Sequence, residues 1–366
     1  MRVLIDTSYA GRGVSGTSVY LERLIAALRE GGRVELVTAA QRRRLAPGRG
    51  GGPRGWVRSA ANALLDALWL HAGLPRAARL LAADLVHHPL PAHSRRIAVA
   101  QACTVHDAAF LHHPAGYGIA WRVLARRRYR AAARGCGALI CPTRATAADL
   151  VSLLGADPGR VVVAHHGPGQ AEADHGPGQA EADSGGPSGG SAAGPLVFVG
   201  DAEERKNLAG LLAAYAAYRA RAKEPAPLVL AGGAAAQAGA PGVTPRRAQG
   251  PAEMLALLRG ARALVHPSLH EGFGLTPLEA MAVGVPVLAV RNAGTEEVCG
   301  DAALLVEPDG LAAGIERIAT DASLREDLAR RGAVRARGFS WAQAACVHES
   351  AYTLALGAPP ARDATP

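Results

Sequence analysis

PSLHEGFGLTPLEAMAVGVP, at residues 267–286, is the most informative segment of the 366-residue chain. An apolar run at residues 263–266 precedes it and predicts a buried strand. Two glycines and a proline then lead into a helical pattern at residues 276–283. A strand, a glycine-bearing turn and a helix N-terminus predict an anion site, with the backbone amides of Phe273, Gly274 and Leu275 pointing outward.

Two glutamates flank this turn, with seven residues between them. We expect Glu271 at the loop and Glu279 about one turn into the helix. Neither is suited to bind phosphate, because like charges repel, but both can accept hydrogen bonds from the hydroxyl groups of a ribose or another sugar. The alternative is one solvated acid and one helix-surface acid without a function.

Strand-like and helical segments alternate on both sides of this segment. The strands are expected at residues 1–7, 34–37, 84–87, 97–105, 138–141, 161–164, 196–200, 228–232, 263–266, 287–290 and 303–306. The helices of the second half are expected at residues 207–222, 251–259, 276–283 and 310–337. Such alternation predicts α/β structure with parallel sheets covered on both faces, and the chain length suits two domains.

The predicted boundaries follow changes in composition. Residues 1–165 are expected to form an N-terminal Rossmann-like domain, and residues 195–338 a C-terminal one. Between them, residues 166–194 are a Gly/Pro-rich linker that contains a tandem repeat, HGPGQAEAD, at 166–174 and 175–183. A last helix at 339–356 is expected to pack back on the N-terminal domain, and 357–366 to form a disordered tail.

Further candidate residues follow other predicted strands. Arg205 and Lys206, in GDAEERKN at 200–207, stand between a strand and a helix, although adjacent basic residues usually lie in solvent. His106 ends the strand at 97–105, although a lone histidine is more often structural. The glycines of the loop at residues 11–17 satisfy G-x-G-x-x-G spacing but lack a suitable acidic partner for a ribose, so a redox role is weak.

The segment at 267–286, with its paired glutamates, glycines and proline, resembles the signature of the retaining glycosyltransferases of family 4. The resemblance implies the GT-B fold, in which two Rossmann-like doubly wound domains face a central cleft. It implies that Glu271 contacts the donor sugar near its 3-hydroxyl and that Glu279 holds the ribose. Arg205 and Lys206 match the cations that neutralise the donor diphosphate and the leaving group, so no metal is required.

The resemblance also assigns the remaining site residues. His106 corresponds to the residue that contacts the 6-hydroxyl of the donor sugar, and Gly16 to the point where the backbone approaches the donor. The expected catalytic set is His106, Glu271, Arg205 and Lys206. The expected donor-binding set is Gly16, Arg205, Lys206, Glu271, Gly272, Phe273, Gly274, Leu275 and Glu279. No cofactor is expected beyond a nucleotide diphosphate sugar as co-substrate.

The charge of the chain is unevenly distributed. Residues 1–165 hold 23 basic and 9 acidic residues, whereas residues 166–366 hold 17 and 22. Arginines cluster at 42–44, 49, 54 and 58, and Arg122, Arg126 and Arg130 share one helical face. We therefore expect the N-terminal half to bind a glycan, lipid-linked or small-molecule acceptor, with an anionic membrane surface as a further partner; a solvated basic face is the alternative.

Other classes of protein fit less well. The five cysteines show neither zinc-site nor disulfide spacing, and the first residues do not have the pattern of a signal peptide, so we expect a cytoplasmic protein, peripheral at most at the inner face of the plasma membrane. His87, His88, His112 and His113 lack the spacing of a metal site. A nucleic-acid-binding protein lacks support because aromatic residues are sparse, at 4%. An epimerase or phosphorylase with the GT-B fold stays open.

Overall fold

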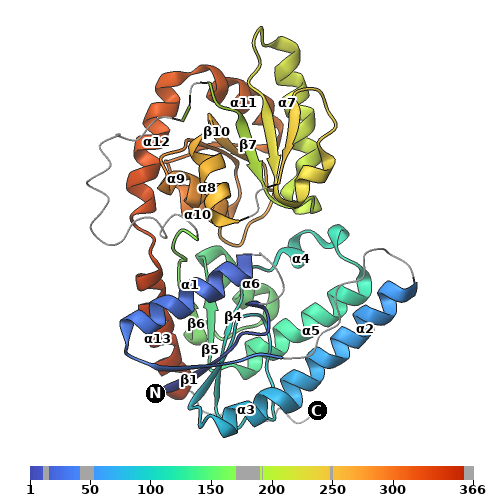
Figure 1. Ribbon diagram of the computed structural model, residues 1–366. Helices are drawn as coiled ribbons and strands as arrows, with labels where there is room; N and C mark the ends of the chain where they lie inside the picture. The colour runs from blue at the N-terminus through green and yellow to red at the C-terminus, as the bar shows by residue number, and fades with distance from the viewer. Residues whose placement is uncertain (11–15, 42–52, 170–189, 192, 248–249, 358–366) are drawn as a thin grey trace. The chain divides into compact units, whose positions relative to one another are not determined.

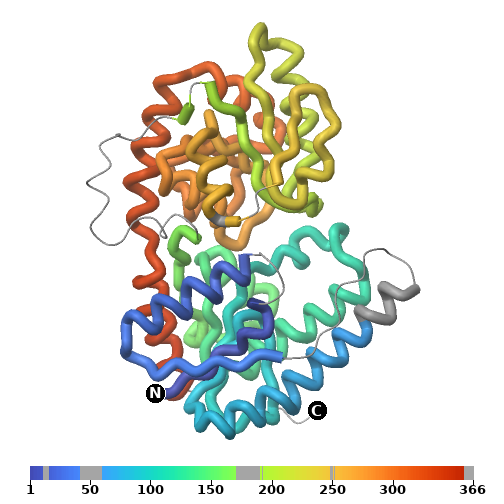
Figure 2. The backbone as a smooth tube through the Cα atoms, in the orientation of Figure 1, coloured from blue at the N-terminus to red at the C-terminus, as the bar shows by residue number. Residues whose placement is uncertain are grey.

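The computed structural model describes residues 1–10, 16–41, 53–169, 190–191, 193–247 and 250–357. The chain divides into two compact units (Figure 2). The first unit holds residues 1–108, 119–165 and the end of the chain from residue 341. The second holds residues 109–118 and 166–340.

The first unit contains a six-stranded parallel sheet in the order β2-β1-β3-β4-β5-β6 (Figure 1). Its strands are β1 (Arg2–Asp6), β2 (Glu35–Ala39), β3 (Leu85–His88), β4 (Ala100–Thr104), β5 (Ala138–Cys141) and β6 (Val161–Val163). Strands β1, β3, β4 and β5 are almost wholly buried. This pattern is typical of a parallel sheet with both faces covered.

Helices cover both faces of the first sheet. They are α1 (Gly16–Gly31), α2 (Pro53–Leu68), α3 (Leu74–Leu80), α5 (Ile119–Gly135), α6 (Arg144–Leu154) and α13 (Trp341–Gly357), with the short turns η2 (Trp69–Gly73) and η4 (Pro158–Arg160). Helices α1 and α13 share one core with the sheet, around Val3, Ile5 and Tyr352. Helix α3 packs with Leu4 and Val86 on the opposite face.

The second unit repeats this architecture with a parallel sheet in the order β12-β11-β10-β7-β8-β9. Its strands are β7 (Leu196–Val199), β8 (Leu228–Ala231), β9 (Val243–Arg246), β10 (Ala263–His266), β11 (Val287–Val290) and β12 (Leu304–Val306). Its helices are α4 (Ala109–His112), α7 (Leu208–Arg221), α8 (Pro251–Arg259), α9 (Leu275–Ala282), α10 (Ala293–Cys299), α11 (Leu311–Thr320) and α12 (Ala322–Ala336). Four short turns are η3 (Pro114–Gly116), η6 (Glu204–Lys206), η7 (Gly232–Gln237) and η8 (Pro308–Gly310).

The two faces of the second sheet also bury separate cores. Helices α7 and α11 pack on one face, around Leu211 and Ile315. Helices α9 and α10 pack on the other, around Leu278 and Val298. The two doubly wound sheets confirm the predicted α/β fold class.

The structure differs from the predicted elements in a few places. Helix α2 begins at Pro53, so the segment that carries Arg54 and Arg58 is helical, whereas the sequence indicated only a glycine-rich basic stretch. Strand β9 was not predicted, because three of its four residues are exposed and one of these three is Pro245. Helix α9 begins at Leu275, one residue before the predicted start.

Some predictions fall outside the described residues. These are the glycine loop before residue 16, the arginines at 42–44 and 49, residues 170–189 with most of the tandem repeat, and the tail from residue 358. The side chains of Arg54 and Arg58 are outside the description as well.

Candidate active site

The second sheet places two sequence motifs side by side. The chain runs from β7 to β8 and β9 on one side, and then returns to add β10 on the other side of β7. The connections therefore leave the sheet in opposite directions at β7 and β10, which is where doubly wound sheets bind ligands at the carboxyl ends of their strands. The segment that carries Arg205 and Lys206 follows β7, and the segment that carries Glu271 follows β10.

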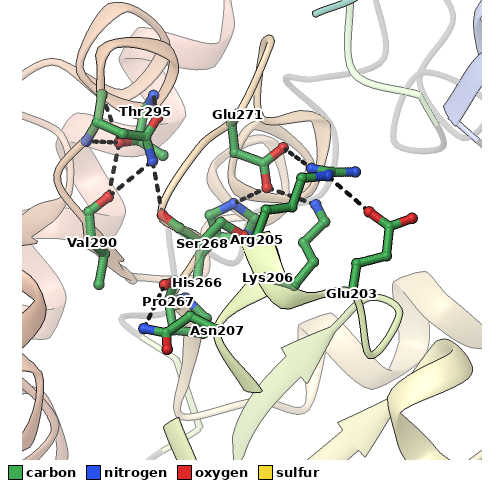
Figure 3. Close-up of polar contacts among 11 residues, drawn as sticks. Glu203, Arg205, Lys206, Asn207, His266, Pro267, Ser268, Glu271, Val290 and Thr295 are labelled. Atoms are coloured by element: carbon green, nitrogen blue, oxygen red, sulfur yellow. Dashed lines mark hydrogen bonds and ion pairs between the residues drawn. The ribbon is translucent and has the colours of Figure 1, made fainter. Parts of the chain in front are cut away.

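Glu271 is the centre of a compact ionic cluster at the carboxyl ends of β7 and β10 (Figure 3). Lys206 Nζ lies 2.6 Å and His266 Nε2 3.0 Å from Glu271 Oε1. Arg205 Nη1 lies 3.5 Å from Glu271 Oε2, and Arg205 Nε lies 2.8 Å from Glu203 Oε2. The structure thus brings three of the predicted residues, Arg205, Lys206 and Glu271, into contact.

The cluster keeps Glu271 ionised. Burial by itself raises the pKa of Glu271, but the charge of Lys206, the contact with His266 and the charge of Arg205 outweigh it and hold the pKa well below its usual range. Burial lowers the pKa of His266, although Glu271 opposes this effect. A carboxylate beside a neutral imidazole and two cations is therefore the expected state near pH 7.

Asn207 ties the two motifs together. It adopts the left-handed conformation, with φ of 52°, which asparagine tolerates better than most residues. Its side-chain amide donates to the carbonyl of Pro267 over 3.3 Å, and the Leu269 N–H donates to the carbonyl of Arg205 over 2.8 Å. These two bonds fix the Glu271 loop to the segment that carries the cations.

The start of α10 supports the same loop from the other side. Asn292 caps this helix and donates from Nδ2 to the carbonyl of Ser268 over 2.9 Å. Gly294 lies so close that a Cβ there would overlap the carbonyl oxygen of Glu271. A residue without a side chain at 294 therefore lets α10 approach the backbone of Glu271.

Helix α9 begins directly after the loop. Gly274 precedes it with φ of 104°, a conformation that glycine adopts without strain. Phe273 is buried, and its ring contacts those of His166 and Phe339, which anchors the turn. Glu279 is buried within α9, one turn after Leu275. The N-terminal amides of α9 and its dipole favour an anion at this end.

The other two predicted site residues belong to the first unit. His106 follows β4, is partly exposed, and donates from Nε2 to the carbonyl of Pro89 over 3.1 Å. Its ring stands edge-on to Tyr20, with the centroids 4.7 Å apart. Burial lowers the pKa of His106 to about 4, so its imidazole is neutral near pH 7. Gly16 is the exposed first residue of α1.

The first unit also contains a cavity of about 780 Å³. It opens beside the carboxyl ends of β1 and β2, against α2 and η2. Its lining includes Thr7, Thr38, Gln41, Leu65, Leu68 and Trp69.

The four histidines considered for a metal site have other contacts. His87 and His88 are buried and hydrogen-bonded to Thr104 and Gln101. His112 and His113 contact the ring of His270. Within the described ranges, no group of three or more His, Cys, Asp or Glu side chains could hold a metal ion.

Sequence reasoning missed three residues that shape the site: His266, Asn207 and Gly294. His266 is the polar last residue of a predicted buried strand, and that position was the signal available. Asn207 was part of the recognised motif without a role. Gly294 follows no pattern, because its reason is a contact with a residue 23 positions away.

Two family models match the chain. The model of "Glycosyltransferase Family 4" matches residues 14–167, and that of "Glycosyl transferases group 1" matches residues 195–335. The chain is 35% identical over 175 residues to the O-antigen chain mannosyltransferase B of Escherichia coli. This match covers 44% of the chain and 46% of the relative, so the chain spans less than half the length of this curated relative.

Solved structures share the fold over nearly the whole chain. A sucrose-phosphate synthase from Thermosynechococcus elongatus has a TM-score of 0.69 at 19% identity, and the match covers 96% of this chain and 98% of that one. HepE of Anabaena, solved with UDP and glucose, has a TM-score of 0.65 at 15% identity, with coverages of 97% and 99%. Together with the sheet topology, these likenesses show the GT-B fold.

Proposed function

The chain belongs to glycosyltransferase family 4, and we propose that it transfers a hexose from a nucleotide diphosphate sugar to an acceptor with retention of anomeric configuration. The observation that carries this proposal is the contact of Arg205 and Lys206 with Glu271, at the strand ends of a doubly wound sheet. Two cations beside a helix N-terminus suit a diphosphate, and a fixed carboxylate suits sugar hydroxyls.

The ionic cluster suggests how the donor is received. Without a ligand, the charges of Arg205 and Lys206 are balanced by Glu203 and Glu271. A donor diphosphate would bind Arg205 and Lys206 in place of these carboxylates. Glu271 would then keep its contact with His266, and its carboxylate oxygens could accept a hydrogen bond from a sugar hydroxyl. The carboxylate would thus exchange one set of partners for another without losing its charge.

The cations also explain the chemistry in this proposal. Negative charge grows on the departing diphosphate as the glycosidic bond to the donor breaks, and Arg205 and Lys206 are already oriented to stabilise it. This role requires no metal ion. Because retention needs attack from the face that the diphosphate leaves, a phosphate oxygen would accept the proton of the attacking hydroxyl.

The remaining predicted residues keep the roles that the family implies. Glu279 would hold the ribose, and the amides near Gly272 to Leu275 would face the diphosphate. His106 would contact the 6-hydroxyl of the sugar with its neutral imidazole, and Gly16 would let the backbone approach the donor. The mannosyl or glucosyl class is favoured by the mannosyltransferase relative and by HepE, whose structure was solved with UDP and glucose.

The cavity of the first unit is the proposed acceptor site. It lies at the strand ends β1 and β2, and its wall combines apolar side chains, such as Leu68 and Trp69, with the polar Thr7 and Gln41. Such a lining suits an acceptor that joins a polar glycosyl end to an apolar group.

Helix α5 supports an anionic membrane surface as a partner. It contains no acidic residue, and its exposed side chains include the apolar Ile119, Trp121, Val123 and Leu124 together with the basic Arg126, Arg127, Arg130 and Arg134. Apolar side chains and arginines on one exposed surface are typical of helices that bind the interface of anionic bilayers. No helix in the described residues is long and apolar enough to cross a bilayer.

The donor is tested first by binding and then by products. A thermal-shift panel of nucleoside diphosphates and their sugars should raise the Tm for one base, since a ligand held by the folded state stabilises it. The donor so identified, incubated with lipid-linked and free glycans, should yield an α-configured glycosidic bond by NMR, if the donor is an α-linked sugar.

The alternatives give different products. Interconversion of the nucleotide sugar without an acceptor would indicate an epimerase, and a sugar phosphate formed from a glycan and phosphate would indicate a phosphorylase. Either result would replace the proposed function.

The membrane partner is tested by sedimentation with phosphatidylglycerol vesicles at low salt. The double variant Arg126→Gln/Arg130→Gln should weaken binding by about 1 kcal/mol for each arginine. A matched pair in the second unit, Arg317→Gln/Arg330→Gln, should leave binding unchanged. Equal binding of all three proteins would count against α5.

A further inference from the structure

Five buried polar side chains of the first unit form one continuous chain of hydrogen bonds. Tyr352 and His348 come from α13, Tyr20 from α1, and His87 and Thr104 from β3 and β4. The oxygen–nitrogen and oxygen–oxygen distances are 2.8 Å for Tyr352–His87, 2.8 Å for His87–Thr104, 2.7 Å for Thr104–Tyr20 and 2.8 Å for Tyr20–His348. All five side chains are fully buried. This series of hydrogen bonds therefore links α13 to α1 through the central strands β3 and β4.

The direction of every bond follows from one carbonyl group. His348 Nδ1 lies 2.7 Å from the carbonyl of Ala344, which can only accept, so Nδ1 carries the proton. Burial lowers the pKa of His348 to about 4, so its ring is neutral and Nε2 accepts the hydroxyl proton of Tyr20. Because Tyr20 has a single hydroxyl proton, Thr104 must donate to it.

The same reasoning fixes the other half of the chain. Thr104 has only one hydroxyl proton, so His87 Nε2 must donate to its oxygen. Burial lowers the pKa of His87 well below its ordinary value, so the ring is neutral and Nδ1 accepts from Tyr352. All donors thus point one way, from Tyr352 to Ala344, and reversing one bond would leave two donors or two acceptors facing each other.

The ring of Tyr20 also forms a wall for His106. The two rings meet edge to face at an interplanar angle of 83°, and the carbonyl of Pro89 holds His106 Nε2–H on the other side. Together these contacts fix the plane and the tautomer of the imidazole, which places its lone pair on Nδ1. Among the described residues, the ionisable groups that act on His106 or lie against it include Asp107, Tyr20, His87 and His348.

We propose that Tyr20 is a positioning residue for His106, and that α13 holds Tyr20 in place through His348 and Tyr352. The last helix of the chain is then part of the reaction machinery of the first unit, acting through the orientation of one imidazole. This inference rests on the proposed contact of His106 with the donor sugar.

The test separates orientation from stability by a matched pair of substitutions in the full chain. Tyr20→Phe keeps the ring and removes the hydroxyl on which the chain of bonds depends. Tyr215→Phe, the control, removes a buried hydroxyl of the second unit that lies 3.0 Å from the carbonyl oxygens of Ala226 and Gly242 and also contacts Arg219. Both variants should lower the Tm, because each loses a buried hydrogen bond.

The first readout is the pKa of His106, measured by NMR on protein with ¹³C-labelled histidine and assigned by the signal that disappears in His106→Gln. In Tyr20→Phe we expect this pKa to rise from about 4 by roughly half a unit or more, because a looser wall admits water. His348→Leu, which removes the acceptor of the Tyr20 hydroxyl, should shift it in the same direction. Tyr215→Phe should not shift it.

The second readout is turnover with the identified donor. Tyr20→Phe should lower kcat by about fivefold while the KM for the donor changes less than twofold, and Tyr215→Phe should change neither. An unchanged pKa and kcat in Tyr20→Phe would overturn the role of Tyr20, and an unchanged pKa in His348→Leu would overturn that of α13. Full turnover in His106→Gln would instead exclude the proposed contact of His106 with the donor sugar. The pKa measurement is independent of that contact, so it would still test the positioning of His106 by Tyr20.

Discussion

The two units bury polar side chains in opposite ways. The interior network of the first unit is neutral. Its histidines, tyrosines and threonine form hydrogen bonds whose donors all point in one direction, and all of these side chains are fully buried. The cluster of the second unit is ionic: Glu271 meets Arg205 and Lys206, whose side chains are 17% and 16% exposed.

This difference shows how burial is matched to the task. A neutral network needs no counter-charge, so it can be fully buried and can fix geometry. An ionic cluster at the carboxyl ends of the strands is costly to break if one charge is removed. A charged ligand can nevertheless replace one member of the cluster, because it supplies the missing charge. The neutral network suits the positioning of a side chain. The ionic cluster suits a site in which a diphosphate replaces a carboxylate as the partner of the two cations.

The largest expected effect comes from breaking the ionic side of the comparison. Lys206→Met removes the cation closest to Glu271 while keeping the length of the side chain. It should lower kcat/KM by about 10²–10³-fold, the usual loss when one preorganised group that stabilises a leaving charge is removed. Steady-state kinetics with the identified donor measures it.

The control is another cation of the same unit. Arg221→Met removes an exposed ion pair between Arg221 of α7 and Glu316 of α11 and should leave kcat/KM within twofold. A comparable loss in both variants would show that the effect of Lys206 is not specific to the site.

The second effect concerns the backbone of the Glu271 loop. Gly294→Ala should force the loop and α10 apart and cost about 1–3 kcal/mol of unfolding free energy, with a loss of turnover. Gly310→Ala is the matched control, because its Cβ would meet only Val306 at an ordinary distance of 3.6 Å. Urea unfolding and kinetics of the two variants decide the point; equal behaviour would mean that the loop absorbs the methyl group.

A smaller effect is expected at His266. His266→Phe leaves Glu271 without its imidazole contact, which should lower turnover by about tenfold. Since that contact helps to hold the pKa of Glu271 down, its loss should also move the acidic limb of the pH–rate profile to higher pH. His266→Gln keeps an N–H donor and should restore part of both; an acidic limb that stays in place would exclude this role.

The last prediction compares how the two units respond to acid. Unfolded histidine titrates near pH 6.5, whereas burial lowers the pKa of His93, His106 and His348 to about 4 in the folded first unit. Between these pH values the unfolded chain binds more protons than the folded chain. The unfolding free energy therefore decreases as the pH is lowered, by up to about 1.4 kcal/mol per pH unit for each histidine.

The second unit should respond less between pH 6.5 and 4.5. The contribution of Glu271, whose pKa is lowered, persists above 4.5 and is lost only below it. Of the histidines in this unit, burial lowers the pKa of His266. All four tryptophans lie in the first unit, so their fluorescence in urea follows that unit, and hydrogen exchange follows the second. Equal losses in both units would contradict the comparison.

Much of this architecture could be predicted from local patterns. Buried strands such as Ala263–His266 and Val287–Val290 have the predicted bounds, because apolar runs between glycines and prolines leave few alternatives. The motif glutamates and the two cations were likewise visible as a spacing and a neighbouring pair. Strand β9 was not predicted, because its residues show no apolar alternation. The start of the helix at Pro53 was not predicted, because Arg54 and Arg58 were grouped with the glycine-rich basic segment before them.

The sequence by itself determined the order of strands and helices, the family resemblance and the residues that bear charge near the predicted turn. Only the tertiary structure decided which of them touch: that Lys206 and His266 share Glu271, and that Tyr20 lies between His348 and His106. The physical reason is range. Local patterns arise from neighbours in the chain, whereas Tyr20 and His348 are 328 positions apart and meet only when α1 and α13 pack on the first sheet.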